Sequence, residues 1–187
     1  MFGALNQGFR FTPRNFAGLL NLPYYSSVFY VNSTGGSDSA NNGTTPSNAF
    51  ATIAGAASAT TAAVDDVILA MPGHAETVTS VITLSKSRVR VIGLGEGNGR
   101  PAITGNGAID AVNITGANVV FENFRFPAPG TDAQTADINV TGAGVTIRNT
   151  RHIGSTTSLN KVSFVTIATG ADDLVIDGMR TYNTVVD

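Results

Sequence analysis

Neighbouring carboxylates come closest, in residue type and spacing, to a chemical site in this sequence. They form three candidate pairs: Asp65 with Asp66, Asp172 with Asp173, and Asp110 with Asp137. Carboxylate pairs can serve as general acid and base in hydrolysis or share a calcium ion. We interpret the first two pairs as turn residues and keep a calcium site as the alternative for the third. No cluster is dense enough for an active site, so we predict no catalytic residue, no metal and no cofactor.

The histidines and a glycine-rich loop are weaker candidates. His74 follows a Pro-Gly turn and His152 ends a predicted strand, and neither belongs to a metal-ligand or triad pattern. The glycines of residues 93–99 are spaced as in a phosphate-binding loop, but Arg100-Pro101 leads into another strand and no helix follows. We therefore expect structural or surface histidines and an ordinary loop.

Three arginines form a column that could meet negative charge. Arg125, Arg151 and Arg180 occupy the same place in three repeated segments. Like charges at the spacing of adjacent strands repel each other. In one interpretation their side chains point into solvent or bind backbone carbonyls. In the other they form a basic strip that faces an acidic partner surface or an anionic glycan.

An internal repeat defines the elements that must position these residues. The repeated segments are 111–125, 137–151 and 165–180. Their Thr-Gly-Ala turns start at Thr115, Thr141 and Thr169, at intervals of 26 and 28 residues. A period of this length indicates stacked supersecondary units.

Each unit is predicted to hold short strands separated by a glycine turn. Apolar and polar residues alternate around the turn, as at Val112 and Ile114, and β-branched residues are frequent. A unit of this length leaves no room for a crossover helix, so each strand must pair with its equivalent in the next unit. The expected fold is all-β, a short parallel β-helix; a small antiparallel sandwich is the alternative.

Two columns of residues support stacking in register. Asparagine or glycine recurs where the backbone would turn, and a charge of alternating sign recurs one residue earlier. The members are Asn123, Asn149, Gly178 and the upstream Gly93, and then Glu122, Arg148 and Asp177. Asparagine and glycine tolerate a left-handed corner, and opposite charges on adjacent strands attract. We expect both columns to line up along the stack.

Composition agrees with a β-rich fold and argues against several classes of partner. Of 187 residues, 42% are hydrophobic and only 13% are charged, with 21 glycines. The net charge of −2 provides no general attraction to nucleic acid, and no apolar run is long enough to span a bilayer. The N-terminus lacks the pattern of a signal peptide, and the absence of cysteine excludes disulfides. We expect neither nucleic acid nor membrane as a partner.

Three parts are predicted along the chain: an arm at 1–27, a capping strand, loop and helix at 28–65, and the β-helix turns at 66–187. The arm is rich in aromatic residues and cannot form a core of its own. Its candidate partner-binding residues are Phe2, Phe9, Arg10, Phe11, Arg14, Phe16, Leu19, Leu20, Tyr24 and Tyr25. The arm either folds back over the end of the coil or inserts these side chains into a partner, which we favour because exposed apolar surface promotes association.

The capping helix is predicted to begin at Thr45 and Pro46, an N-cap followed by a proline in the first helical position. Four residues would then form one apolar stripe: Phe50, Ile53, Ala54 and Ala57. This helix is expected to cover the first turn of the coil.

Several segments carry a specific resemblance to a known superfamily. They are residues 30–32, 36–38, 49–53, 66–73 and 89–95. They resemble the opening of right-handed parallel β-helix proteins of the pectate-lyase-like superfamily, and the resemblance covers about residues 28–182. The superfamily contains lyases, hydrolases, adhesins and bacteriophage virion proteins, so the resemblance implies the fold and no single function.

The resemblance and the arm together favour a structural role. The phenylalanine-rich start is similar to the virion-anchoring arms of phage structural proteins. We predict a non-enzymatic bacteriophage virion protein, most simply a capsid decoration (cement) protein on the outer surface of a capsid or tail. It is expected to be a homotrimer bound to the major capsid protein or to other virion proteins. The alternatives are a tailspike-type or other polysaccharide-binding or -degrading β-helix protein and, third, a bacterial surface fragment.

Overall fold

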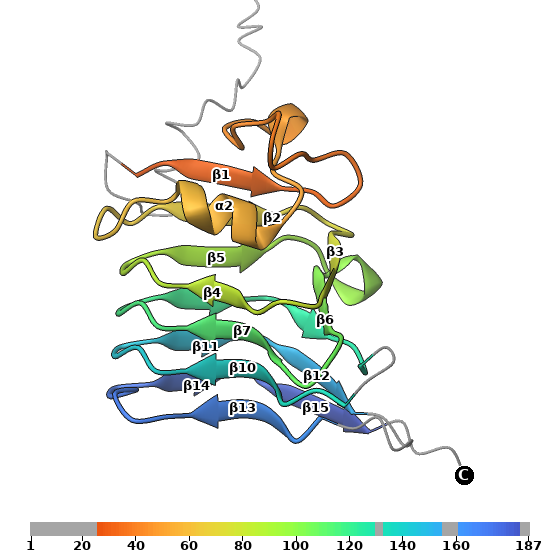
Figure 1. Ribbon diagram of the computed structural model, residues 1–187, viewed down its shortest axis with the longest axis vertical. Coiled ribbons are helices and arrows are strands. Elements are labelled where there is room, and N and C mark those ends of the chain that lie inside the picture. Colours follow the sequence, from red (N-terminus) through yellow and green to blue (C-terminus); the bar gives the residue numbers. More distant parts are fainter. Residues whose placement is uncertain (1–25, 130–132, 155–160, 184–187) are drawn as a thin grey trace, which may run out of the picture.

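The computed structural model describes residues 26–129, 133–154 and 161–183, which form a parallel β-solenoid of about four turns (Figure 1). Each complete turn of the coil contributes one short strand to each of three parallel sheets, here called A, B and C. This confirms the prediction of an all-β parallel β-helix. The arm, with its candidate residues from Phe2 to Tyr25, lies outside the described residues.

From β2 onward, the strands belong in strict rotation to sheets A, B and C, and β1 adds an extra strand to sheet A. Sheet A consists of β1 (Val28–Val31), β2 (Val67–Ala70), β5 (Arg90–Gly93), β8 (Val120–Glu122), β11 (Thr146–Arg148) and β14 (Val175–Asp177). Sheet B consists of β3 (Ala75–Val78), β6 (Ala102–Gly105), β9 (Arg125–Phe126), β12 (Arg151–Gly154) and β15 (Arg180–Asn183). Sheet C consists of β4 (Ile82–Leu84), β7 (Asp110–Ile114), β10 (Ala136–Val140) and β13 (Ser163–Ile167).

The predicted repeats lie directly on one another. In sheet C, Ile138 pairs with Val112 on one side and Val165 on the other. In sheet A, Ile147 pairs with Phe121 and with Ile176. A shift by one residue would turn every buried side chain outward, so the apolar alternation specifies this register.

The core is a continuous apolar column inside the three sheets. Outside the last turn, the aliphatic side chains that point inward from the strands are buried, as predicted from their spacing. Phe121, Phe124 and Phe126 form an aromatic cluster at the turn from sheet A to sheet B, where the first two rings stack with centroids 4.5 Å apart. Each buried side chain of this size stabilises the fold by about 1.5–3 kcal/mol relative to an exposed one.

The predicted corner column is confirmed at three positions and wrong at the fourth. Asn123, Asn149 and Gly178 have φ of 66°, 48° and 66°, in the left-handed region. Gly93 instead lies inside β5, where a side chain would collide with the backbone of Asn123. At this position glycine permits the close approach of two backbone segments, one at Gly93 and one at Asn123. A longer loop makes the corner in that turn of the coil.

The predicted charge column is in register. Arg148 pairs with Glu122 on one side and Asp177 on the other, so opposite charges alternate along the outer face of sheet A.

The capping helix begins later than predicted. Thr45 and Pro46 start only a 3-10 turn, η1 (Pro46–Asn48), and the Thr45 side chain makes no capping hydrogen bond. The α-helix is α2 (Ile53–Ala59), whose N-cap is Thr52, the hydroxyl of which accepts from the Gly55 N–H at 2.9 Å. Phe50 stays extended because its backbone hydrogen-bonds to β1 through Tyr30 and Asn32.

The helix α2 packs against β1, β2 and β4, next to the edge of sheet C at that end of the stack (Figure 1). Ile53, Ala56 and Ala57 are its buried residues. At the opposite end, β13, β14 and β15 form the last turn, and apolar residues such as Ile167 and Val175 are exposed there. In the part of the chain that the structure describes, no helix has the length and apolar character to cross a membrane.

Candidate functional site

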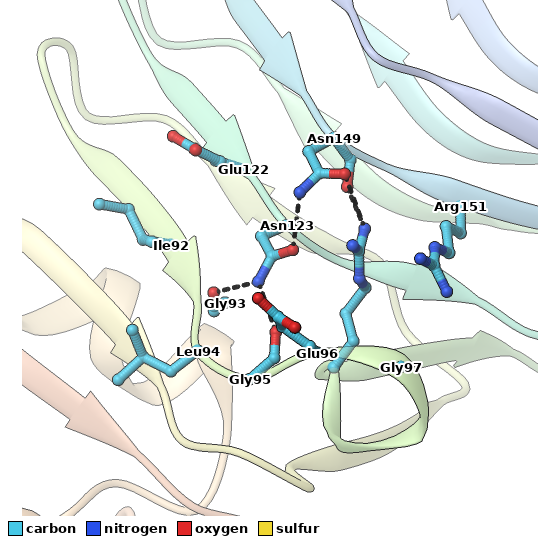
Figure 2. Close-up of a pocket in the computed structure, with 11 residues that line it drawn as sticks. Ile92, Gly93, Leu94, Gly95, Glu96, Gly97, Glu122, Asn123, Asn149 and Arg151 are labelled. Atoms are coloured by element: carbon cyan, nitrogen blue, oxygen red, sulfur yellow. Dashed lines mark hydrogen bonds between the residues drawn. The ribbon is translucent and has the colours of Figure 1, made fainter.

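A polar cavity of about 580 Å³ lies outside the solenoid, where sheet A turns into sheet B (Figure 2). It lies beside the ends of β5, β8 and β11 and the start of β12. The lining residues are Ile92, Gly93, Leu94, Gly95, Glu96, Gly97, Arg100, Glu122, Asn123, Asn149 and Arg151.

The cavity exists because one corner of the coil is longer than the corners that come after it. In the next turns, Asn123 or Asn149 and one further residue join sheet A to sheet B. Between β5 and β6 residues 94–101 make this connection and include the 3-10 turn η2 (Gly97–Gly99). Gly95 and Gly97 have φ of 100° and 55°, which other residues rarely adopt. The glycine-rich segment that the sequence predicts to be an ordinary loop is therefore one wall of the cavity.

Stacked asparagine side chains form a second wall. Asn123 Nδ2 donates to the carbonyl oxygens of Gly93 at 2.6 Å and Gly95 at 3.0 Å. Asn149 Nδ2 donates to Asn123 Oδ1 at 3.0 Å (Figure 2). The side chains that make the corners thus also fix the loop to the stack.

Arg100 brings a buried positive charge to the cavity. The residue is only 4% exposed, and its Nη1 donates to the backbone carbonyl and, at 3.2 Å, to Oδ1 of Asn149. Its Nε is buried and has no hydrogen-bond partner among the described residues, and the same holds for Nε of Arg151. Burial lowers the pKa of Arg100, and the charges of Arg151 and Arg180 lower it further. The charge of Glu96 raises this pKa, but it does not cancel the combined lowering by burial and by the two arginines.

The predicted arginine column lies next to this cavity. Arg151 pairs in register with Arg125 and Arg180, and each is the first residue of its strand in sheet B. Arg125 Nε donates to the backbone carbonyl of Arg100 at 3.2 Å, which matches the expected contact with a carbonyl. Over the described ranges, none of the four arginines lies within 4.0 Å of a carboxylate oxygen. The binding role of the strip stays a prediction.

Two acids complete the lining. Glu96 is exposed on the loop, and Glu122 is half-buried at the end of β8. Figure 2 shows Glu96 in front of Asn123 and Arg151 farther along sheet B. The cavity thus offers guanidinium donors, amide groups and carboxylates on a common surface, a combination suited to a ligand with both hydroxyl and acidic groups.

The carboxylate pairs take other roles. Asp65 forms an ion pair with Arg88, and Asp66 is buried and accepts from the backbone N–H groups of Ser27 and Thr61 at 2.7 Å each. Asp173 has φ of 54°, which agrees with its assignment to a turn. These placements agree with the interpretation of both adjacent pairs as structural.

The calcium alternative for Asp110 and Asp137 is not supported by the geometry. Asp110 pairs with Ala136 and not with Asp137, so the two carboxylates are not equivalent in the stack. Asp137 is fully buried and binds Lys161 and His152. Within the described segments, no group of three or more His, Cys, Asp or Glu side chains is arranged to hold a metal ion.

Both histidines are buried. His74 accepts a hydrogen bond from the Ser33 N–H at 3.0 Å and is 1% exposed. His152 lies between Asp137 and Thr150, at 2.8 and 3.0 Å. The structural interpretation of these residues therefore describes them better than the surface one.

Sequence reasoning missed Arg100, Glu96 and Glu122 as members of a site. A signal was present, because the connection between β5 and β6 is several residues longer than its equivalents in the later repeats. An insertion at one corner of a regular coil often carries function, since connecting loops tolerate change and the strands do not.

Comparison with known proteins gives one informative result. No protein-family model matches the chain, and no curated protein matches its sequence. Among solved structures, a protein named rhamnogalacturonan lyase matches with a TM-score of 0.56 and 16% sequence identity, over 83% of this chain and 51% of the other. The chain thus spans about half the length of that structure.

This structural match corrects the prediction about enzymatic activity and agrees with the prediction of the fold. The prediction of a protein that is not an enzyme is overturned, because the solved structure with this fold is an enzyme. At this identity the likeness establishes the fold alone, since one fold supports many activities. The chain is a parallel β-solenoid, a fold that it shares with the rhamnogalacturonan lyase.

Proposed function

We propose that the protein binds an acidic polysaccharide at the cavity between sheets A and B and along the adjoining arginine column. The observation that carries this proposal is the buried guanidinium of Arg100, which has a free Nε and no carboxylate partner among the described residues. A buried charge without a counter-charge is costly, so a site of this kind favours an anionic ligand.

The chemistry of the lining fits the carboxylates and hydroxyls of a sugar acid. Arginine binds carboxylates through paired N–H donors, with a planar geometry that lysine does not offer. Asn149 and Glu122 supply the amide and carboxylate groups that hydrogen-bond hydroxyls. Because successive strands lie about 4.8 Å apart, Arg125, Arg151 and Arg180 present regularly spaced charges to an extended polymer.

The fold supports the choice of a polysaccharide over a small anion. The matched structure is named for an activity on rhamnogalacturonan, an acidic polysaccharide. Because that protein is a lyase, cleavage must be measured together with binding. A lyase leaves a new carbon–carbon double bond in the sugar, which absorbs ultraviolet light.

Calorimetric titration with polygalacturonate and rhamnogalacturonan, with neutral dextran as the control polymer, tests the proposal. We expect binding to the acidic polymers alone, weakened roughly tenfold or more in Arg151→Gln and Arg100→Met, which corresponds to about 1.4 kcal/mol or more. Arg148→Gln is the matched control, because Arg148 is exposed in the same turn between Glu122 and Asp177. Equal affinity in all variants, or equal binding to dextran, would overturn the proposal.

A second candidate is a place in a bacteriophage virion, as a capsid decoration protein or part of a tailspike. It is supported by the exposed apolar side chains of the last turn, among them Ile167, Val175 and Ile176, which a subunit or virion partner could cover. Assembly into a homotrimer would cover these apolar side chains. Light scattering on the full chain and on Ile176→Asp checks the proposal: a wild-type trimer that dissociates in the variant supports it, and a wild-type monomer that binds no capsid shells contradicts it.

A further inference from the structure

A buried ionic cluster between sheets B and C has no part in the proposed site. Asp137 on β10 is fully buried, as is His152 on β12, and Lys161, two residues before β13, has a side chain only 1% exposed. Burying a lysine and an aspartate together costs more than their attraction returns unless every polar atom is satisfied. The cluster therefore calls for an explanation beyond stability.

The reactive groups of this cluster are in contact. Lys161 Nζ lies 2.7 Å from Asp137 Oδ1 and 2.9 Å from Oδ2. On the other side of the carboxylate, His152 Nδ1 lies 2.8 Å from Oδ2, and its Nε2 lies 3.0 Å from Thr150 Oγ1. An amine, a carboxyl group and a group able to transfer protons thus share one enclosed volume.

The surroundings favour the uncharged form of the amine. His152 stacks on Phe126 with ring centroids 5.0 Å apart, and Lys161 Nζ lies 6.0 Å from the ring centre of Phe164. Burial lowers the pKa of Lys161, and the Asp137 carboxylate offsets only part of this effect. A proton passed from amine to carboxylate gives a neutral nucleophile beside a neutral carboxylic acid, which an apolar site tolerates better than two charges.

We propose that Lys161 Nζ and Asp137 Cγ condense in the folded chain to an intramolecular amide, an isopeptide bond, with release of one water molecule. The nitrogen lone pair forms the new bond to Cγ, and the bond from Cγ to Oδ2 breaks. Oδ2 leaves as water, with the hydrogen of the carboxylic acid and one hydrogen of the amine. His152 Nδ1, beside Oδ2, moves the proton to the departing oxygen. No oxidant or cofactor is required.

The site already holds hydrogen-bond partners for the product. Lys161 Nζ donates to the carbonyl oxygen of Phe126 at 3.0 Å, and the one N–H that remains after condensation can keep this bond. Asp137 Oδ1, which becomes the amide oxygen, accepts from Gln134 Nε2 at 3.2 Å. Gly105 leaves room for the Gln134 side chain, because a Cβ there would collide with it. The N–H and the oxygen of the neutral amide would both have hydrogen-bond partners, whereas the ion pair keeps two charges in a buried site.

The proximity of the two groups provides the driving force that free amines and carboxylates lack in water. Reacting groups held in contact can reach effective concentrations of about 10⁵–10⁸ M, and the enclosed site excludes the water that would reverse the reaction. The bond would join β10 to the chain just before β13, so it would fasten the last turn to the turn above it.

Intact mass spectrometry of the purified, denatured full chain tests this proposal. We expect a mass lower than the sequence mass by one water molecule, and a branched tryptic peptide that links residues 126–148 to 152–180, because trypsin does not cut after an acylated lysine. Lys161→Met and Asp137→Ala should show the unreduced mass. Lys86→Met is the matched control, since Lys86 is the other lysine and is exposed, and it should still lose water.

Two further variants separate the chemistry from a loss of folding. Asp137→Asn keeps a reactive carbonyl and should lose one ammonia molecule instead of water. His152→Gln retains both reacting groups and should slow the reaction by roughly 100-fold. A wild-type chain that is folded by circular dichroism and has its full sequence mass would overturn the proposal and show the cluster to be a buried ion pair.

Discussion

Asn123 shows how one residue serves both the fold and the cavity. Its backbone takes the left-handed conformation that closes a corner, with φ of 66°, and its side chain donates to the carbonyls of Gly93 and Gly95. Glycine could supply the first property and not the second, and alanine supplies neither. Substitutions at this position can therefore separate the two contributions.

We expect Asn123→Ala to lower the free energy of unfolding by about 1–2 kcal/mol more than Asn123→Gly, because alanine must adopt the left-handed region and glycine does so freely. Both variants lose the side-chain hydrogen bonds, each of which contributes about 0.5–1.5 kcal/mol. Urea unfolding followed by circular dichroism measures the difference. An equal loss in the two variants would mean that the corner is not strained.

At this scale, some parts of the site were predictable and others were not. The alignment of Arg125, Arg151 and Arg180 is a consequence of the repeat, because residues at equivalent positions in a parallel coil must stack. Arg100 could not be found in this way, since it lies in a loop that has no equivalent in other turns. Lys161 also falls outside the strand pattern, and its contact with Asp137 depends on how a long connection returns to the core.

Single strands owe their stability to the turns on both sides of them. Ile147 and Ile176 are the same residue type at the same register position, in β11 and β14. Ile147 is 0% exposed and Ile176 is 38% exposed, because no further turn covers β14 in the described chain. Because both residues are isoleucine, a comparison of the two sites measures how much an adjacent turn of the coil contributes to stability.

We expect Ile147→Ala to destabilise the protein by about 2–5 kcal/mol, as for other buried large-to-small changes. Ile176→Ala should cost less than about half as much, since a large part of its surface is already in water. Thermal and urea unfolding of the two variants tests this. A similar cost for both would indicate that a partner covers the last turn in solution, which would favour the virion proposal.

Predictions of secondary-structure elements were correct where the sequence pattern recurs over several units. Alternation over many units predicts the strands and their register, because one side of every strand must face the core. The start of the helix was wrong by seven residues, with the N-cap predicted at Thr45 and found at Thr52. Phe50 explains the error: its backbone pairs with β1, an interaction between distant residues that overrides the local proline signal.

The molecule as a whole behaves as a one-dimensional stack in which each turn contacts its neighbours. In such a stack, stability depends on the coupling between adjacent turns, and an end turn with one neighbour opens most readily. The end that holds β1 is packed by α2, whereas β14 and β15 have one neighbouring strand each in the described chain. The two ends should therefore differ in their local stability.

Hydrogen exchange measured by mass spectrometry can test both the difference in local stability between the two ends and the proposed cross-link. We expect the amides of β14 and β15 to exchange faster than those of β11 and β12, with which they pair. β13 should be better protected than β14, because it starts two residues after Lys161 and the amide to Asp137 would hold it to β10. Lys161→Met should remove this advantage and leave β4 and β5 unchanged, since coupling fades with distance along the stack. Equal protection of β11 and β14 in the wild type would mean that the last turn is covered in solution, and the assembly of this chain with a partner would then explain its exposed isoleucines.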